Sequence, residues 1–179
     1  VWKERDASNG DPAADIWLAR RYYFGLGGVE RNVELALRHF RRSAERGFAE
    51  GLYNLGSFHD NGDAGLEVNP TLALEYFQKA ADHPQPFGMA LEVVGNYHLG
   101  YKDVLPVNVE KAKFYYEKAA NQNSPEGHYG LAMIYLEKRN GVREANAMRG
   151  SGVDVPQAMV HLVSTRDVRY IVLHYTVQL

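Results

Sequence analysis

One fifteen-residue phrase occurs three times in this chain at nearly constant spacing, and this repetition restricts the fold more than any other feature. The phrase reads NVELALRHFRRSAER at 32–46, NPTLALEYFQKAADH at 69–83 and NVEKAKFYYEKAANQ at 108–122. Each copy begins with asparagine, has alanine four residues later and an aromatic residue four beyond that. Because these last two residues lie one helical turn apart, they predict a buried stripe on one face of a helix.

The spacing between copies is regular. The alanines Ala36, Ala73 and Ala112 are 37 and 39 residues apart, and the aromatic residues that follow them have the same spacing. A weaker fourth copy begins at Asp154, with Ala158 in the alanine position and Leu162 in the aromatic position. A repeated unit of this length predicts a stacked helical array.

A second segment repeats in front of each phrase, at 10–25, 47–62, 86–100 and 123–138. It carries one large apolar position, occupied by Leu18, Leu55, Val94 and Leu131. The next position is always small, with Ala19, Gly56, Gly95 and Ala132, as is the position four residues earlier, with Ala14, Gly51, Ala90 and Gly127. Glycine inside a helix costs about 1 kcal/mol relative to alanine. Its recurrence therefore predicts close helix contact, and we expect Gly56→Leu to destabilise more than Gly62→Leu unless Gly62 has positive φ.

Each unit therefore predicts two helices joined by a glycine-containing loop. The second helix begins after Asn32, Asn69, Asn108 or Asp154, residue types that accept hydrogen bonds from the free N–H groups of a first turn. Pro70 suits the first helical position. The predicted helices span 14–23, 33–46, 48–61, 71–83, 87–99, 109–121, 124–138 and 156–164.

Together these patterns predict an all-α fold, a right-handed α-solenoid of about four helix-turn-helix repeats. The repeats are expected at 10–46, 47–83, 84–122 and 123–165, in a single domain over 1–179 with a divergent tail at 166–179. The alternative is a four-helix bundle in which the similarity of the segments is accidental.

At these residues the chain resembles the Sel-one-like repeat family, a relative of the tetratricopeptide repeats. GFAEGLYNLG followed by NPTLALEYFQKAA carries the resemblance, which covers about residues 10–163. The resemblance implies a scaffold that binds proteins, including adaptors of endoplasmic-reticulum-associated degradation. Some family members are hydrolases, but these are cysteine-rich, and this chain has no cysteine. The chain departs from the family at His59 and His98, which replace tyrosine.

Composition narrows the classes of partner. A net charge of −2 gives no electrostatic reason to expect nucleic acid or a membrane surface. No apolar stretch is long enough to cross a bilayer, so we expect a soluble fragment without membrane contact. The chain begins with valine, which suggests a piece of a longer protein, such as the luminal part of a secretory-pathway or membrane-anchored protein.

No motif predicts catalysis, a metal or a cofactor. His59 and His98 occupy the same repeat position, but no third ligand is evident. HDNGDAGLE at 59–67 does not fit a calcium loop, and GLGG at 25–28 lacks a phosphate-binding pattern. We therefore expect no catalytic residue, no metal site and no cofactor.

The expected binding surface is the concave wall formed by the first helix of each repeat. Its candidate residues flank the core stripe: Trp17, Arg20, Arg21, Asn54, Phe58, Val93 and Tyr97. Under a second interpretation Phe58, Tyr97 and Ile134 pack against the next unit, and Trp17 caps the stack.

The expected function is a non-enzymatic scaffold for a protein or peptide partner. A structural spacer or oligomerisation module is one alternative, and a hydrolase-type enzyme is another. The tail alternates apolar and polar residues from Ile171 to Leu179, as a strand does. This alternation favours a strand. Three interpretations of the tail stay open: a capping helix that forms under tertiary packing, a strand that pairs with another chain in self-association, and a divergent terminus.

Overall fold

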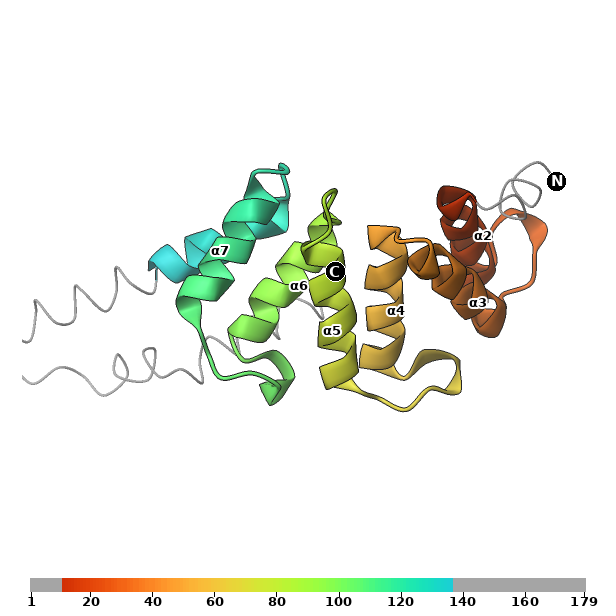
Figure 1. Cartoon of the computed structure of the whole chain (residues 1–179), viewed down its shortest axis with the longest axis horizontal. Coiled ribbons are helices and arrows are strands. Elements are labelled where there is room, and N and C mark those ends of the chain that lie inside the picture. The colour runs from red at the N-terminus through yellow and green to blue at the C-terminus, as the bar shows by residue number, and fades with distance from the viewer. Residues whose placement is uncertain (1–10, 137–179) are drawn as a thin grey trace, which may run out of the picture. The chain divides into compact units, whose positions relative to one another are not determined.

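The structure, a computed structural model, describes residues 11–136, and all regular elements in that range are helical (Figure 1). The α-helices are α2 (Pro12–Phe24), α3 (Val33–Glu45), α4 (Ala49–Asn61), α5 (Pro70–Ala81), α6 (Gly88–His98), α7 (Val109–Ala120) and a further helix at 125–136. Short 3-10 turns follow α2, α4 and α6: η1 (Leu26–Gly28), η2 (Asp63–Gly65) and η3 (Tyr101–Asp103). The predicted all-α fold is confirmed, and the predicted helix limits within this range differ from these by at most two residues.

The chain divides into two compact units, residues 1–94 and 95–179. In the first unit α2 packs on α3, α3 on α4 and α4 on α5, so that consecutive helices lie side by side (Figure 1). In the second unit Leu99 and residues of α7 form a core with Ile134. The expectation of one domain over 1–179 stays a prediction.

Some predicted features lie outside the described residues. These are the fourth cap at Asp154, the helix at 156–164 with Ala158 and Leu162, and the tail at 166–179. The fourth repeat is therefore described only in its first helix, at 125–136.

Asparagine begins the second helix of each pair in the same way three times. Oδ1 of Asn32, Asn69 and Asn108 accepts a hydrogen bond from the backbone N–H three residues later, at 2.8, 3.0 and 2.9 Å. The backbone N–H of each asparagine also donates to the carbonyl oxygen of the residue ten positions earlier, in the preceding helix. The predicted caps are confirmed, and each also ties its helix to its partner.

A glycine with left-handed backbone follows the first helix of each of the first three pairs. Gly25, Gly62 and Gly100 have φ of 69°, 75° and 94°. Two residues later the backbone is left-handed again, and in the second and third repeats this residue is not glycine: Ala64 and Lys102 have φ of 56° and 54°. The turn is thus set by the loop as a whole, because three residues other than glycine, Ala64, Lys102 and Asp103, have left-handed backbone in these loops.

The repeated small positions allow close packing of the two helices of a pair. The aromatic rings of the phrase are buried, with Phe77 2% and Tyr116 3% exposed. A Cβ atom on Gly56 would lie 2.7 Å from the ring of Phe77, and one on Gly95 would lie 2.9 Å from that of Tyr116. This confirms that contact distance selects glycine there.

The longer spacing of 39 residues arises in one loop. Three residues separate α3 from α4, whereas six residues separate α5 from α6. The loop nevertheless ends with the same contact, because the backbone N–H of Phe48 donates to the carbonyl of Ser43 and that of Phe87 donates to the carbonyl of Ala80. The additional residues are therefore accommodated without changing how the next helix starts.

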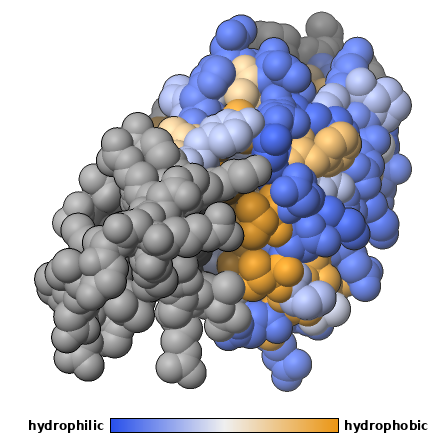
Figure 2. Space-filling view, turned by 90° about the vertical axis from the view of Figure 1, so that its left-hand side faces the viewer, coloured by the Kyte–Doolittle hydropathy of each residue, from blue (hydrophilic) through white to orange (hydrophobic). Residues whose placement is uncertain are grey.

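Figure 2 shows a mainly hydrophilic face with a compact hydrophobic area.

One imidazole–phenol pair stacks within each described repeat. His59 stacks on Tyr76 with ring centroids 5.7 Å apart, and His98 stacks on Tyr115 at 5.7 Å. In the first repeat the two types are exchanged, with Tyr22 on the first helix and His39 on the second, 5.9 Å apart. The histidines that depart from the family pattern therefore keep a flat ring contact.

The stacked histidines predict that stability falls in mild acid. Burial, and secondarily the charge of Arg41, lowers the pKa of His59, while burial and Lys111 lower the pKa of His98. Since the unfolded chain binds these protons more readily, stability is complete above the ordinary pKa of 6.5 and decreases as the pH falls below it. Urea denaturation at several pH values measures this slope.

The double variant His59→Tyr and His98→Tyr keeps a stacked ring but removes the titrating group. We expect a smaller loss of stability between neutral pH and mild acid than in the parent chain. An equal slope in both proteins would show that other groups cause the pH dependence.

Candidate interaction surface

The surface selected by the structure lies on the side of α2 that faces away from the core. Asp11 caps the start of the helix, its side chain accepting from the Ala13 N–H at 2.9 Å. Leu18 is 2% exposed, whereas Trp17 is 43% and Phe24 63% exposed. Leu26, in the following turn, is 53% exposed. Trp17, Arg21, Phe24 and Leu26 are called the α2 surface below.

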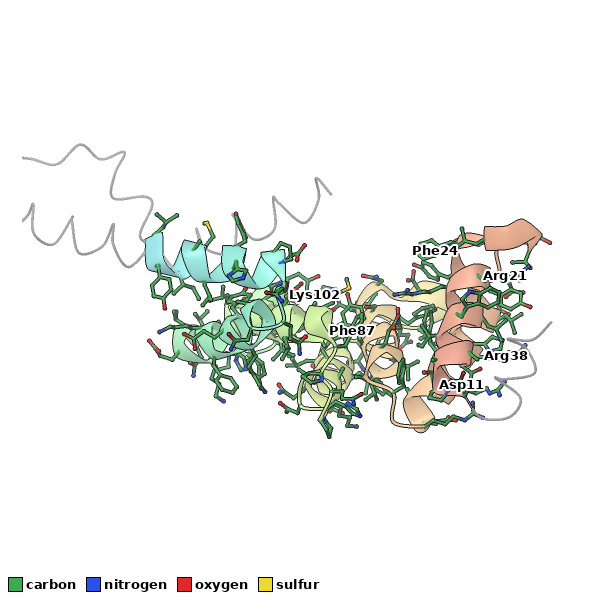
Figure 3. All side chains as sticks on the ribbon, turned by 90° about the horizontal axis from the view of Figure 1, so that it is seen from above. Asp11, Arg21, Phe24, Arg38, Phe87 and Lys102 are labelled. Carbon is green, nitrogen blue, oxygen red and sulfur yellow. The ribbon has the colours of Figure 1, made fainter. Side chains whose placement is uncertain are left out.

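Arg21 fixes this surface to its own loop. Its Nε donates to the Leu26 carbonyl at 3.1 Å and its Nη2 to the Gly27 carbonyl at 2.8 Å. Its guanidinium also lies over the Trp17 ring, 5.2 Å from the centroid. Figure 3 shows Arg21 and Phe24 toward the end of α2 opposite Asp11. The arginine therefore links the tryptophan to the turn that carries Leu26.

A second guanidinium binds the same turn. Arg31 donates from Nε to the Tyr23 carbonyl at 3.0 Å and lies 5.7 Å from the centre of the Tyr23 ring. The Tyr23 ring in turn contacts that of Phe24, with centroids 5.0 Å apart. Tyr23 also donates its hydroxyl to Asp63 at 3.1 Å. Burial, with the Asp63 hydrogen bond second, raises the pKa of Tyr23, so this phenol stays a neutral donor.

Arg20, another predicted binding residue, is 55% exposed and forms an ion pair. Its Nη2 lies 2.6 Å from Oε1 of Glu50, a side chain that is only 16% exposed. Burial raises the pKa of Glu50, and Arg20 opposes that change. This ion pair connects α2 with α4, so Arg20 contributes to the contact between repeats.

Four other residues predicted to form the binding surface are buried or partly buried: Asn54, Phe58, Val93 and Tyr97. Phe58 is 3% exposed, and its ring packs on those of Tyr23 and Phe40 of the preceding helix pair. Tyr97 is 0% exposed, with its ring 5.1 Å from that of Tyr101.

The packing interpretation therefore holds for Phe58, with the preceding pair rather than the next one as its neighbour. Ile134 is likewise buried, in a cluster with Leu99 and Tyr116. Asn54 donates from Nδ2 to the Glu50 carbonyl at 2.7 Å and is partly buried, as is Val93.

The sequence did not predict Phe24 and Leu26. Phe24 lies seven residues after Trp17, two turns along the same helical side, and this spacing was the available signal. Both residues fall where the helix meets its loop, outside the repeated core pattern.

A buried carboxylate distinguishes the first repeat. Asp15 is 0% exposed, where the second and third repeats have Leu52 and Leu91. Its Oδ1 lies 2.8 Å from Nδ1 of His39, and its Oδ2 pairs with Arg46. Nη1 of Arg42 lies 3.7 Å from Oδ1 of Asp15. The cluster joins the start of α2 to the end of α3.

This cluster contains residue types found in hydrolases but not their arrangement. Ser43 lies one turn after His39, yet its hydroxyl donates to the Pro12 carbonyl at 3.0 Å and the residue is 0% exposed. An attacking hydroxyl must reach both a base and a substrate. Ser43 reaches neither in this arrangement, so the cluster is structural.

Across residues 11–136, no three His, Asp or Glu side chains are grouped closely enough to hold a metal ion. Within the same range, no helix combines the length and the apolar character that a membrane crossing requires. The expectations of no metal, no cofactor and no membrane contact stay predictions.

Known proteins with similar sequences include two longer ones. An uncharacterized protein of Neisseria meningitidis is 27% identical over 139 residues, covering 78% of this chain and 27% of that protein. The ERAD-associated E3 ubiquitin-protein ligase component HRD3B of Arabidopsis thaliana is 34% identical over 101 residues, covering 56% of this chain and 15% of HRD3B. The chain thus spans less than a third of either relative.

Two solved structures share the fold. A Sel1 repeat protein from Oxalobacter formigenes superposes with a TM-score of 0.63 at 32% identity, over 73% of this chain and 94% of that one. The protective antigen c5321 of uropathogenic Escherichia coli, which has an SLR fold, gives a TM-score of 0.66 at 27% identity, over 75% of this chain and 28% of c5321.

The Sel1 repeat family model matches three successive segments, at 12–48, 49–84 and 89–124. These agree closely with the first three predicted repeats, while the fourth predicted repeat stays a prediction. The matched segments contain the asparagine caps, the buried aromatic residues and the close glycine contacts described above. The chain therefore belongs to the Sel1 repeat family.

Proposed function

We propose that this chain is a non-enzymatic scaffold that binds a protein or peptide partner through the α2 surface. Sel1 repeat proteins are protein-interaction scaffolds. The observation that supports this surface is the grouping of three exposed apolar side chains, Trp17, Phe24 and Leu26, around an arginine held by its own loop. Tryptophan and arginine are enriched among the residues that dominate binding energies at protein interfaces.

The fixed geometry of this surface favours binding. Side chains that are already ordered lose little conformational entropy when a partner binds. Arg21 uses two donors on carbonyl oxygens and lies over Trp17, so both side chains are restrained before contact. A structural spacer, one alternative, has no need of such an exposed group, whereas an oligomerisation module would use it to bind a second copy of this chain.

We also propose that the chain is part of a larger adaptor of the secretory pathway. The support is the 34% identity to HRD3B over 101 residues, since HRD3B is named as a component of an ERAD-associated ubiquitin ligase. Purification of the tagged chain with ubiquitin-ligase components from microsomes would support this placement. Recovery of only cytosolic partners would contradict it.

The double variant Trp17→Ala and Phe24→Ala is expected to reduce partner capture at least tenfold, because it removes the apolar contacts at the centre of the surface. The measurement is affinity purification from cell extract followed by quantitative mass spectrometry. Both side chains are exposed, so the helical circular dichroism signal should stay unchanged.

The matched control is Val68→Ala, since Val68 is 60% exposed and belongs to a different repeat. Capture by the control should equal that of the parent chain. If the double variant captures the partner as well as the control does, the α2 surface is not the binding site.

A further inference from the structure

We infer that the α2 surface takes a peptide segment with a carboxylate next to an apolar side chain, an inference that rests on the proposed function. Two guanidiniums, those of Arg21 and Arg31, approach the turn that carries Phe24 and Leu26. The apolar group supplies contact area, and the two cations define the charge of the partner.

The placement of the cations follows from their hydrogen bonds. Arg21 donates to the carbonyls of Leu26 and Gly27, and Arg31 donates to the carbonyl of Tyr23. Carbonyl oxygens are free at the end of a helix, where they attract cations. Both guanidiniums therefore lie beside the same few residues at the end of α2.

Neither cation is neutralised within residues 11–136. The contacts of Arg21 and Arg31 there are the carbonyls above and the rings of Trp17 and Tyr23, and no carboxylate is among them. Arg46 differs, because it pairs with Asp15. Within the same range, no hydrogen bond or ion pair occupies Arg21 Nη1 or either terminal nitrogen of Arg31, so a ligand can use these donors.

This donor arrangement favours a carboxylate. A guanidinium presents a planar fork of N–H donors that matches carboxylate geometry, and charge-assisted bonds are about twice as strong as neutral ones. Trp17, Phe24 and Leu26 favour an aromatic or aliphatic neighbour in the same segment. A nucleic acid could also use arginine and aromatic rings, but a net charge of −2 opposes binding to a polyanion.

A random peptide library displayed on phage tests this inference. Selection against the parent chain, followed by counter-selection against Trp17→Ser, yields the peptides that depend on the α2 surface. Their affinities are then measured by fluorescence anisotropy for the parent chain, for Phe24→Ser and for the control Val68→Ser. A Trp2→Phe background leaves Trp17 as the only tryptophan, so its fluorescence reports contact directly.

The surface-dependent peptides are expected to contain Asp or Glu beside an apolar residue. Phe24→Ser should weaken them at least tenfold, whereas Val68→Ser should leave them unchanged. Changing their Asp and Glu to Asn and Gln, or raising the salt concentration, should also weaken binding. Surface-dependent peptides that are neutral or basic, or a single-stranded oligonucleotide with the same Trp17 dependence, would overturn the inference.

Failure to recover any surface-dependent peptide would overturn it as well. In that case the proposed function is judged separately, by whether the parent chain still captures a protein partner from extract. Capture that persists but does not depend on acidic peptides would leave the scaffold function intact and remove only the assigned partner chemistry.

Discussion

Replacing Gly51 with leucine is expected to lower the free energy of unfolding by about 3 kcal/mol. A Cβ atom at this position would lie 2.6 Å from the backbone nitrogen of Ala44 and 2.9 Å from the backbone carbon of Ser43. The contact is with the backbone of α3, which cannot rotate away as a side chain can. Even Gly51→Ala should destabilise, although alanine normally stabilises a helix by about 1 kcal/mol relative to glycine.

Urea denaturation followed by helical circular dichroism measures this difference. Glu75→Leu is the control, because Glu75 is exposed on α5 and leucine is a good helix former. Gly56→Leu should cost somewhat less, about 1–3 kcal/mol, because part of its contact is with the Phe77 side chain. A Gly51→Ala protein as stable as the parent would show that the two helices are not in close contact.

Asp15→Asn is expected to lower the free energy of unfolding by about 2 kcal/mol. The substitution keeps the shape but removes the charge that balances Arg42 and Arg46 and that accepts from His39. Breaking a fully buried ion pair costs about 3–5 kcal/mol. The effect here is smaller because the arginine side chains are 40% and 32% exposed and keep part of their hydration.

The same denaturation measurement tests this prediction, with Glu45→Gln on exposed α3 surface as the control for loss of one negative charge. The control should change stability by less than about 0.5 kcal/mol. Equal midpoints for Asp15→Asn and Glu45→Gln would mean that the buried cluster does not stabilise the first repeat.

The helical pairs could be predicted because several local signals agree. Asparagine at 32, 69 and 108 marks each second helix, and alanine and aromatic residues one turn apart mark its buried side. The structure places each signal where the pattern requires it, with the caps bonded and Phe77 buried. Repetition adds information, since an accidental signal would not recur at the same spacing.

Backbone conformation in the loops was harder to predict. Gly62 has φ of 75°, and a Cβ there would lie 2.9 Å from Val68, so the stated exception applies and Gly62→Leu is also unfavourable. Ala64 and Lys102 adopt left-handed conformations that their residue types do not favour. These conformations follow from the connection between two packed helices, which local propensity does not contain.

The candidate surface was predicted only in part, for a physical reason. Equivalent positions of different repeats have the same place on their helix, but different side chains surround them. Phe58 is covered by the preceding helix pair, whereas Trp17 is exposed on the first described pair. The burial of Asp15 could not be predicted from the pattern either. A carboxylate in an apolar position can be buried only when it has partners, and the sequence does not show that His39 and Arg46 contact it.

Site-specific photo-crosslinking tests the central claim most directly, that the chain binds a protein through the α2 surface. A benzophenone amino acid is placed at Phe24 in one protein and at Val68 in another, two positions with similar exposure of 63% and 60%. After irradiation in cell extract, the account predicts a discrete crosslinked partner from position 24 and none from position 68. A partner that crosslinks equally from both positions, or only from position 68, would contradict it.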